Sequence, residues 1–378
     1  MPEIALPPSL QDQLRLRQPV LRVTPLLIGI NVLVFLAMLA NGAGVWHSPN
    51  GVQLAWGANF GPATQDGQWW RLASAMFLHF GVLHLLLNMW ALWDSGQFVE
   101  RFYGYARFAA IYFISGVSGN LLSLVAHQGQ AVSGGASGAI FGVYGALLVC
   151  LWHERQFLQP SEFRWLFWGA AGFAALTIVF GLLVEGIDNA AHIGGFIAGV
   201  LSGTVLLRTL RADLRPIGQA RGVAALALAG TIAVLVSLIP PPAYRWHDEL
   251  RARQEISEFL KDDAAIGESW RSIVKESKRG DSSFDELAGR IDAAIGDRYA
   301  ASFEQLSQAP DDPALPSAAT LAALRQYAQT RRDASRSLAE SLRRRDASGM
   351  AARPLPDANG PGQGFSGPGK GVAAPSGR

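Results

Sequence analysis

Hydrophobic residues form seven long blocks before residue 240, and polar residues separate these blocks. A helix needs about 18 to 20 apolar residues to cross a bilayer, so each block predicts a transmembrane helix. The predicted helices lie near residues 25–42, 76–96, 106–126, 137–152, 165–184, 189–207 and 222–239. The pattern therefore predicts an all-α fold, a polytopic membrane helix bundle.

Arginines are placed unevenly between the predicted helices. They precede the first helix and lie in every second loop after it, whereas the loops 43–75, 127–136 and 185–188 contain one basic residue, Arg71. Because short basic loops stay in the cytoplasm, we expect a cytoplasmic N-terminus. Seven crossings then put the C-terminal tail outside, and we expect the membrane to be a bacterial inner membrane.

The composition changes after the seventh block. Residues 241–348 mix charged and apolar positions at helical spacing, as at Ile256, Phe259 and Leu260, which predicts a soluble helical domain. Residues 349–378 are mainly Pro, Gly, Ala and Ser. Such a segment cannot bury a core, and we predict that it is disordered.

Charge and cysteine content argue against a nucleic-acid partner, a disulfide framework and a cysteine-built metal site. The net charge is +2, and no basic run is interleaved with aromatic residues, so no nucleic-acid partner is indicated. The single cysteine, Cys150, lies in an apolar block. This excludes a disulfide framework and a cysteine-built metal site.

The loop 43–75 is long, rich in Gly and Trp, and nearly free of charge. Loops of this length are usually functional or disordered. Its tryptophans either rest the loop in the outer membrane interface or form a plain aromatic belt.

Ser137 stands among glycines, directly before the apolar run 139–151. At the start of a helix its backbone N–H has no helical partner, and the helix dipole favours negative charge there. These groups would stabilise the oxyanion formed if Ser137 attacked a carbonyl. The alternatives are a helix cap, or glycines that only allow close packing.

His192 lies one turn into another apolar block and is followed by Gly195 and Gly199. Gly138 and Gly142 repeat this spacing after Ser137, and such small-residue faces let membrane helices approach closely. Close contact would bring the serine and the imidazole together as nucleophile and base. Asp188, one turn before His192, is expected to cap the helix, with a triad role as the alternative.

His84 and Asn88 are four residues apart and share a helical face, from which they could donate to an oxyanion. His79 precedes His84 by five residues, roughly 140° around a helix, so we expect no compact site of all three. A metal site needs three or four ligands, and no acidic or cysteine partner has a fitting spacing. We therefore expect no metal.

Five motifs now occur in order. They are Trp70-Arg71, the spacing of His79, His84 and Asn88, Glu100 with Gly104, Gly135-Ala136-Ser137-Gly138, and Ala191-His192 with Gly195 and Gly199. Over about residues 20 to 210, the chain resembles the rhomboid family of intramembrane serine proteases. The resemblance implies six core helices within residues 25–210. The arginine placement makes residues 1–24 a cytoplasmic segment, and the last apolar block makes residues 211–240 a linker and a seventh helix.

The resemblance also implies roles for these residues. Ser137 would be the nucleophile and His192 the base, with the Ser137 N–H, His84 and Asn88 forming the oxyanion hole. His79 would brace the site, and Trp70, Arg71 and Glu100 would stabilise the fold and its first loop. Substrates would be single-pass membrane proteins in the lipid bilayer, and no cofactor is implied.

The chain departs from the family pattern in two places. Phe141 stands where many members have a tyrosine stacked on the base, so a ring is present without a hydroxyl. The seventh helix is absent from many bacterial members.

Two other functions compete with proteolysis. A catalytically silent rhomboid-like protein would bind membrane clients without cutting, but the retained serine and histidine favour chemistry. A small transporter would explain the intramembrane His and Asn residues. Against it, no charged residue is expected mid-membrane and no inverted repeat is visible.

Overall fold

The computed structural model describes residues 9–208, 218–279 and 282–348. The chain divides into two compact units, the first ending at Pro242 and the second beginning at Ala243. The predicted disordered tail, 349–378, and part of the predicted linker lie outside the described residues. We describe each unit by itself.

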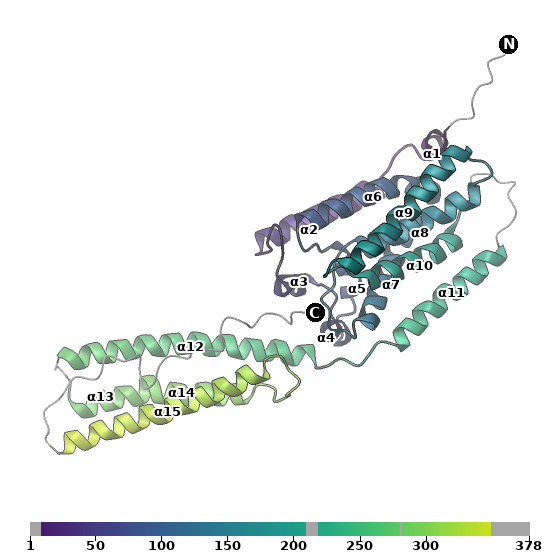
Figure 1. The fold of residues 1–378 in the computed structure, drawn as a ribbon. Helices are drawn as coiled ribbons and strands as arrows, with labels where there is room; N and C mark the ends of the chain where they lie inside the picture. The colour runs from purple at the N-terminus through teal and green to yellow at the C-terminus, as the bar shows by residue number, and fades with distance from the viewer. Residues whose placement is uncertain (1–8, 209–217, 280–281, 349–378) are drawn as a thin grey trace, which may run out of the picture. The chain divides into compact units, whose positions relative to one another are not determined.

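All regular secondary structure among the described residues of the first unit is helical, apart from one isolated bridge between Asn59 and Ser133. Its helices are α1 (Leu10–Arg17), α2 (Val23–Ala40), α3 (Asn50–Trp56), α4 (Gly61–Gln65), α5 (Arg71–Ser74), η1 (Ala75–Phe77), α6 (Val82–Tyr103), α7 (Tyr105–Ala126), α8 (Ser137–Glu154), α9 (Pro160–Leu183), α10 (Asn189–Leu206) and α11 (Gly218–Ser237) (Figure 1). The all-α prediction is confirmed.

Six of these helices are long and apolar enough to cross a membrane: α2, α7, α8, α9, α10 and α11. A seventh candidate is the pair formed by residues 71–77 and α6, which is bent by 95°. The predicted polytopic bundle is therefore confirmed, with one of the seven predicted spans broken.

The predicted helix over 76–96 was wrong at both ends. Residues 78–81 are not helical, and α6 begins only at Val82 and continues to Tyr103. The break is held by backbone bonds to the first loop: the Ser48 N–H donates to the Phe80 carbonyl (2.7 Å), and the Val82 N–H donates to the Val45 carbonyl (2.8 Å). These bonds replace helical ones, and they come from residues far away in the sequence.

The shift of α6 also changes the place of Asp94, which lies near the middle of this helix and not near its end. Its carboxylate accepts a hydrogen bond from the Tyr144 hydroxyl of α8 (3.1 Å).

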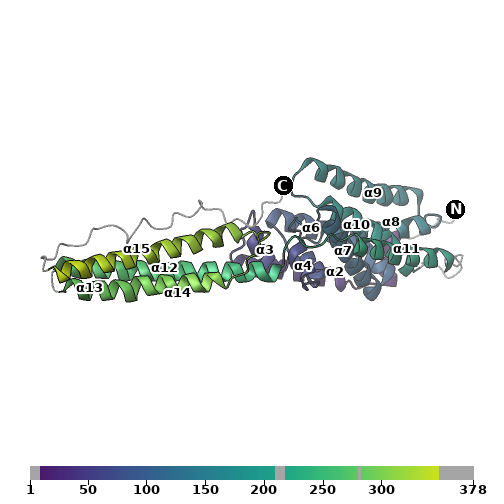
Figure 2. The same ribbon diagram turned by 90° about the horizontal axis from the view of Figure 1, so that it is seen from below.

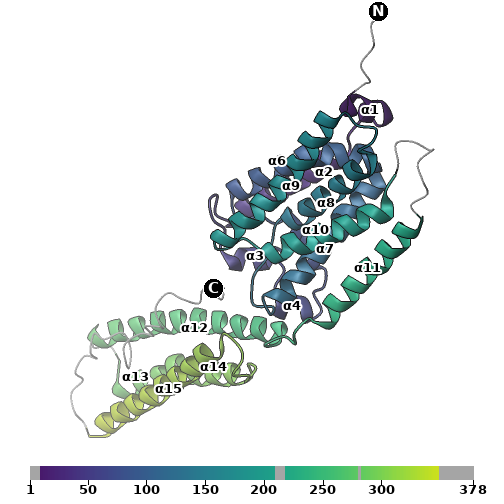
Figure 3. The same cartoon turned by 45° about the vertical axis from the view of Figure 1, so that its right-hand side comes forward.

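The centre of the unit is a layer in which α10 packs against α7 and α8 (Figure 1, Figure 3). Glycines from α8 and α10 face each other along this contact. A Cβ atom built on Gly195 would collide with Gly138, and one built on Gly199 would collide with Gly142. The backbones are therefore close enough that no side chain fits between them.

Glu100, near the end of α6, joins that helix to the start of α2. Its buried carboxylate accepts hydrogen bonds from the N–H groups of Arg22 (2.6 Å), Val23 (3.0 Å) and Thr24 (2.7 Å), and from the Thr24 hydroxyl (2.6 Å). Helix starts leave such N–H groups without partners. Glu100 therefore satisfies the start of α2 and fixes it to α6.

The second unit confirms the predicted soluble helical region. It contains α12 (Trp246–Arg279), α13 (Phe284–Ile291), the π-helix η2 (Asp292–Gly296), α14 (Asp297–Ser307) and α15 (Ala318–Ala347), which pack together (Figure 2). Phe259 and Trp270 lie in its apolar core. A polar cluster crosses this core, in which the Tyr299 hydroxyl donates to Asp263 (2.7 Å).

Candidate active site

Ser137 and His192 are in hydrogen-bond contact. The Ser137 Oγ lies 2.9 Å from the His192 Nε2, and His192 is 5% exposed. Ser137 is the first residue of α8, and His192 lies in the first turn of α10. The facing glycines after each residue hold these two helix starts together.

The contact suits a neutral imidazole that acts as a base. In the tautomer with its proton on Nδ1, the imidazole accepts the serine hydroxyl proton at Nε2. In the part of the chain that the structure describes, no group hydrogen-bonds to this Nδ1. Such an imidazole can take the serine proton.

The Phe141 ring holds the imidazole in plane. The two rings are parallel within 2°, with centroids 4.3 Å apart. Phe141 lies one turn after Ser137 on α8, so a single helix supplies both the hydroxyl and the stacking partner. The ring provides this packing without a hydroxyl of its own.

His84 lies in the first turn of α6 and faces the serine loop. A Cβ built on Gly135 would stand 3.0 Å from the His84 ring and 3.7 Å from the Ser137 Oγ. Gly135 also has a φ of 146°, which favours glycine. The glycine before Ser137 thus allows the imidazole of His84 to approach the nucleophile loop.

Asn88 follows one turn later on α6. Its Nδ2 donates to the His84 carbonyl (2.8 Å), which leaves the second amide hydrogen for another acceptor.

The expectation that His79 and His84 lie on one helix was wrong. The two rings are 5.1 Å apart, centroid to centroid, because His79 lies in the extended break before α6 and not on its surface. His79 is fully buried, and its carbonyl accepts a bond from the Gln53 side chain (3.0 Å). The structure therefore places the His79 ring beside the His84 ring, and the His84 ring next to Gly135 in the loop before Ser137.

Trp70 and Arg71 support the loop 43–75. The buried Arg71 guanidinium donates to the carbonyls of Leu54 (2.8 Å) and Ala58 (3.0 Å) and lies 4.9 Å from the Trp70 ring centre. The loop is ordered into the short helices α3, α4 and α5.

Asp188 caps α10, as expected. Its Oδ1 accepts from the Ala191 N–H (2.9 Å), and it makes no hydrogen bond to the imidazole of His192. The geometry is that of a Ser-His pair without an acidic third member.

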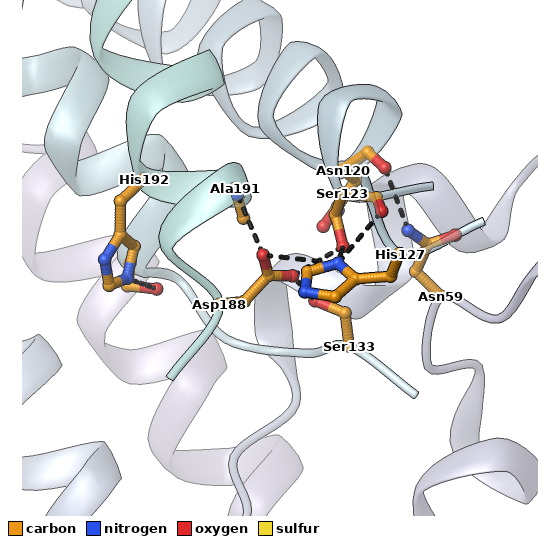
Figure 4. Close-up of polar contacts among 9 residues, drawn as sticks. Asn59, Asn120, Ser123, His127, Ser133, Asp188, Ala191 and His192 are labelled. Atoms are coloured by element: carbon orange, nitrogen blue, oxygen red, sulfur yellow. Dashed lines mark hydrogen bonds and ion pairs between the residues drawn. The ribbon is translucent and has the colours of Figure 1, made fainter. Parts of the chain in front are cut away.

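Sequence reasoning missed the serines around Asp188. Ser123 of α7 and Ser133 of the loop 127–136 both donate to its Oδ2, at 2.5 and 2.6 Å (Figure 4). Ser133 was visible only as part of the glycine-rich run before Ser137. Nothing in the sequence pairs Ser123 with Asp188. Among the described residues, no group of three or more His, Cys, Asp or Glu side chains could hold a metal ion.

Comparison with known proteins now adds to this geometry. Residues 66–209 match the Rhomboid domain family. The chain therefore contains a region similar to the Rhomboid domain. It is 38% identical over 184 residues to rhomboid protease GluP of Bacillus subtilis (strain 168), an alignment that covers 48% of this chain and 34% of that protein.

Plant relatives are also similar to part of the chain. The chain is 39% identical over 153 residues to RHOMBOID-like protein 5 of Arabidopsis thaliana, covering 38% of this chain and 46% of the relative. RHOMBOID-like protein 9, chloroplastic, of the same plant is 37% identical over 153 residues, covering 40% and 34%. The chain thus spans about a third to a half of the length of these rhomboid relatives. The Rhomboid domain match and the six apolar helices support a multi-pass membrane protein.

Proposed function

We propose that this protein is a rhomboid serine endopeptidase that cuts single-pass transmembrane proteins near the outer membrane face. The observation that carries the proposal is the 2.9 Å contact between Ser137 Oγ and His192 Nε2. It combines a nucleophile and a base, which acyl transfer requires, at the starts of two packed helices. The 38% identity to rhomboid protease GluP supports the same chemistry.

In the proposed reaction, His192 Nε2 takes the hydroxyl proton while Ser137 Oγ attacks the carbonyl carbon of the substrate peptide bond. The tetrahedral intermediate collapses when His192 returns the proton to the leaving amine. The resulting acyl-enzyme is opened by water, with His192 again as base. No cofactor takes part in these steps.

The oxyanion would be met by donors from two helices. The Ser137 N–H belongs to the first turn of α8 and has no helical acceptor. His84 lies next to the loop from α6 and Asn88 follows one turn later on that helix; the imidazole and the free amide hydrogen can donate. Preorganised donors of this kind contribute about 10²–10³-fold each.

The proposed side of the membrane follows from the loops next to the site. Ser137 and His192 follow the loops 127–136 and 185–188, which contain no lysine or arginine. Loops without these residues are typical of the outer face. A cytoplasmic N-terminus and an extracytoplasmic tail, in a bacterial inner membrane, complete the proposal.

The test is labelling of the purified protein by a fluorophosphonate, which reacts with activated serines, followed by cleavage of a reconstituted single-pass substrate. Ser137→Ala and His192→Ala should each remove labelling and cleavage. Ser202→Ala is the matched control, because Ser202 is a buried serine of α10 bonded to its own helix. A folded wild type that neither labels nor cleaves would refute the protease proposal and favour a silent client-binding protein.

A further inference from the structure

We propose that Asp188 is a positioning residue that fixes the nucleophile loop against the helix carrying the base. The inference rests on the proposed function, since it concerns the Ser137–His192 pair. Its basis is a cluster that we call the Asp188 cluster: Asp188, Ser123, Ser133 and His127 (Figure 4).

The carboxylate of Asp188 does more than cap a helix. A cap needs one oxygen, and Oδ1 fills that role on Ala191. The second oxygen, Oδ2, accepts two hydroxyl bonds, from Ser123 (2.5 Å) and from Ser133 (2.6 Å). These serines come from α7 and from the loop 127–136, so one side chain joins three segments.

Two of those segments carry the proposed catalytic pair. Ala191 is the residue before His192, and Ser133 lies four residues before Ser137. Hydrogen bonds that a charged group accepts are about twice as strong as those between neutral groups. The Asp188 carboxylate thus sets the position of the loop 127–136 relative to the start of α10. It contacts neither Ser137 Oγ nor the imidazole of His192.

The cluster is also joined to the loop 43–75. Ser133 exchanges two backbone bonds with Asn59, at 2.8 and 2.9 Å. The Asn59 side chain donates to the Asn120 carbonyl of α7 (3.0 Å), one turn before Ser123. Loop 43–75, loop 127–136 and α10 therefore form one hydrogen-bonded frame behind the site.

His127 closes the outer side of the cluster. Its Nδ1 donates to the Ser123 carbonyl (3.0 Å) and lies 4.0 Å from the Asp188 Oδ1. The ring orders the end of α7 next to the carboxylate. None of these contacts of His127 involves His192. The Asp188 cluster would therefore position Ser137 and His192 through the backbone segments that it joins.

The experiment compares the rate of fluorophosphonate labelling per folded molecule, with the thermal unfolding midpoint measured alongside. We expect Asp188→Ala to slow labelling of Ser137 by about tenfold or more, because an error near 1 Å in reacting groups costs up to about 10²-fold. Asp188→Asn should label within about threefold of wild type, since asparagine caps equally well and serine hydroxyls can turn to accept. Ser133→Ala should slow labelling, whereas Ser202→Ala should not.

Glu100→Gln is the matched control for stability. Glu100 is also a carboxylate that satisfies a helix start, but that helix is α2. We expect a lower midpoint with an unchanged labelling rate per folded molecule. If Asp188→Ala behaves in the same way, its role is only structural and the inference fails. If Asp188→Asn is as slow as Asp188→Ala, charge and not position matters, and the inference also fails.

These outcomes differ from failure of the protease proposal. A wild type that labels at Ser137 while Asp188→Ala labels equally fast removes the positioning role alone. A folded wild type that does not label refutes the Ser-His chemistry, and the positioning role with it.

Discussion

Replacing Gly199 by alanine should move Ser137 and His192 apart, although Gly199 lies two turns after His192 on α10. A Cβ at this position would lie 2.5 Å from the carbonyl carbon of Gly142 and closer still to its Cα and oxygen. Carbon atoms normally rest about 3.5–4.0 Å apart. The obstacle is backbone, which cannot rotate aside, so α8 and α10 must move apart by about 1 Å or more.

A shift of that size exceeds the tolerance of the hydrogen bond. The Ser137–His192 contact would lengthen from 2.9 Å to nearly 4 Å, beyond the range of about 3.2 Å in which such bonds form. We expect labelling and cleavage to fall by about 10²-fold, which corresponds to about 2.7 kcal/mol. The unfolding free energy should fall by about 1–3 kcal/mol, as for other overpacked sites.

The assay is fluorophosphonate labelling per folded molecule, with thermal unfolding followed in the same detergent. Gly230→Ala is the control, because a Cβ on Gly230 of α11 meets nothing within 4 Å. It should label like wild type and gain up to about 1 kcal/mol from helix propensity. Wild-type labelling by a folded Gly199→Ala protein would show that contact between these backbones does not set the geometry of the pair.

Four further changes test other parts of the structure. Glu100→Ala leaves N–H groups at the start of α2 without their acceptor and should lower the unfolding free energy by about 3 kcal/mol, as a thermal melt would show. Arg71→Lys cannot reproduce the bonds to the Leu54 and Ala58 carbonyls, so limited proteolysis should cut the loop 43–75 faster; an unchanged rate would contradict this role. Phe141→Ala removes the ring stacked on the base and should slow labelling by up to about tenfold, whereas Phe141→Tyr should not. Burial raises the pKa of the Tyr299 phenol, so the folded second unit favours the neutral form of this side chain. The resulting stabilisation is present below about pH 10 and is lost as the pH rises above it. Circular dichroism melts should therefore show a smaller loss of stability at high pH in Tyr299→Phe than in the wild type.

The sequence predicted the spans well where the signal was local. Predicted ends at 106–126 and 189–207 lie within one residue of α7 and α10, because length and hydrophobicity are properties of the segment itself. The glycine spacing likewise brought Ser137 and His192 to adjacent helices, because small faces act by simple contact.

The errors arose where distant segments decide local structure. The break at 78–81 depends on backbone bonds to residues 45–48, and no periodicity shows such bonds. Because of that error, the prediction put His79 on the helix and Asp94 near its end. In the structure, His79 precedes α6 and Asp94 lies near its middle. The partners of Asp188 were missed for the same reason, since Ser123 and Ser133 lie on separate segments.

The contact between α8 and α10 has a consequence for how this chain tolerates mutation. Substitutions of Gly195, Gly199 and Gly203 all meet backbone atoms of α8, at Gly138, Gly142 and Ala146. A comprehensive mutational scan should therefore show intolerant positions every four residues along α10, extending well past His192. Such a stripe would resemble a long substrate-binding surface in the data. Its cause would be that the contact between α8 and α10 leaves no room for even one methyl group at these positions.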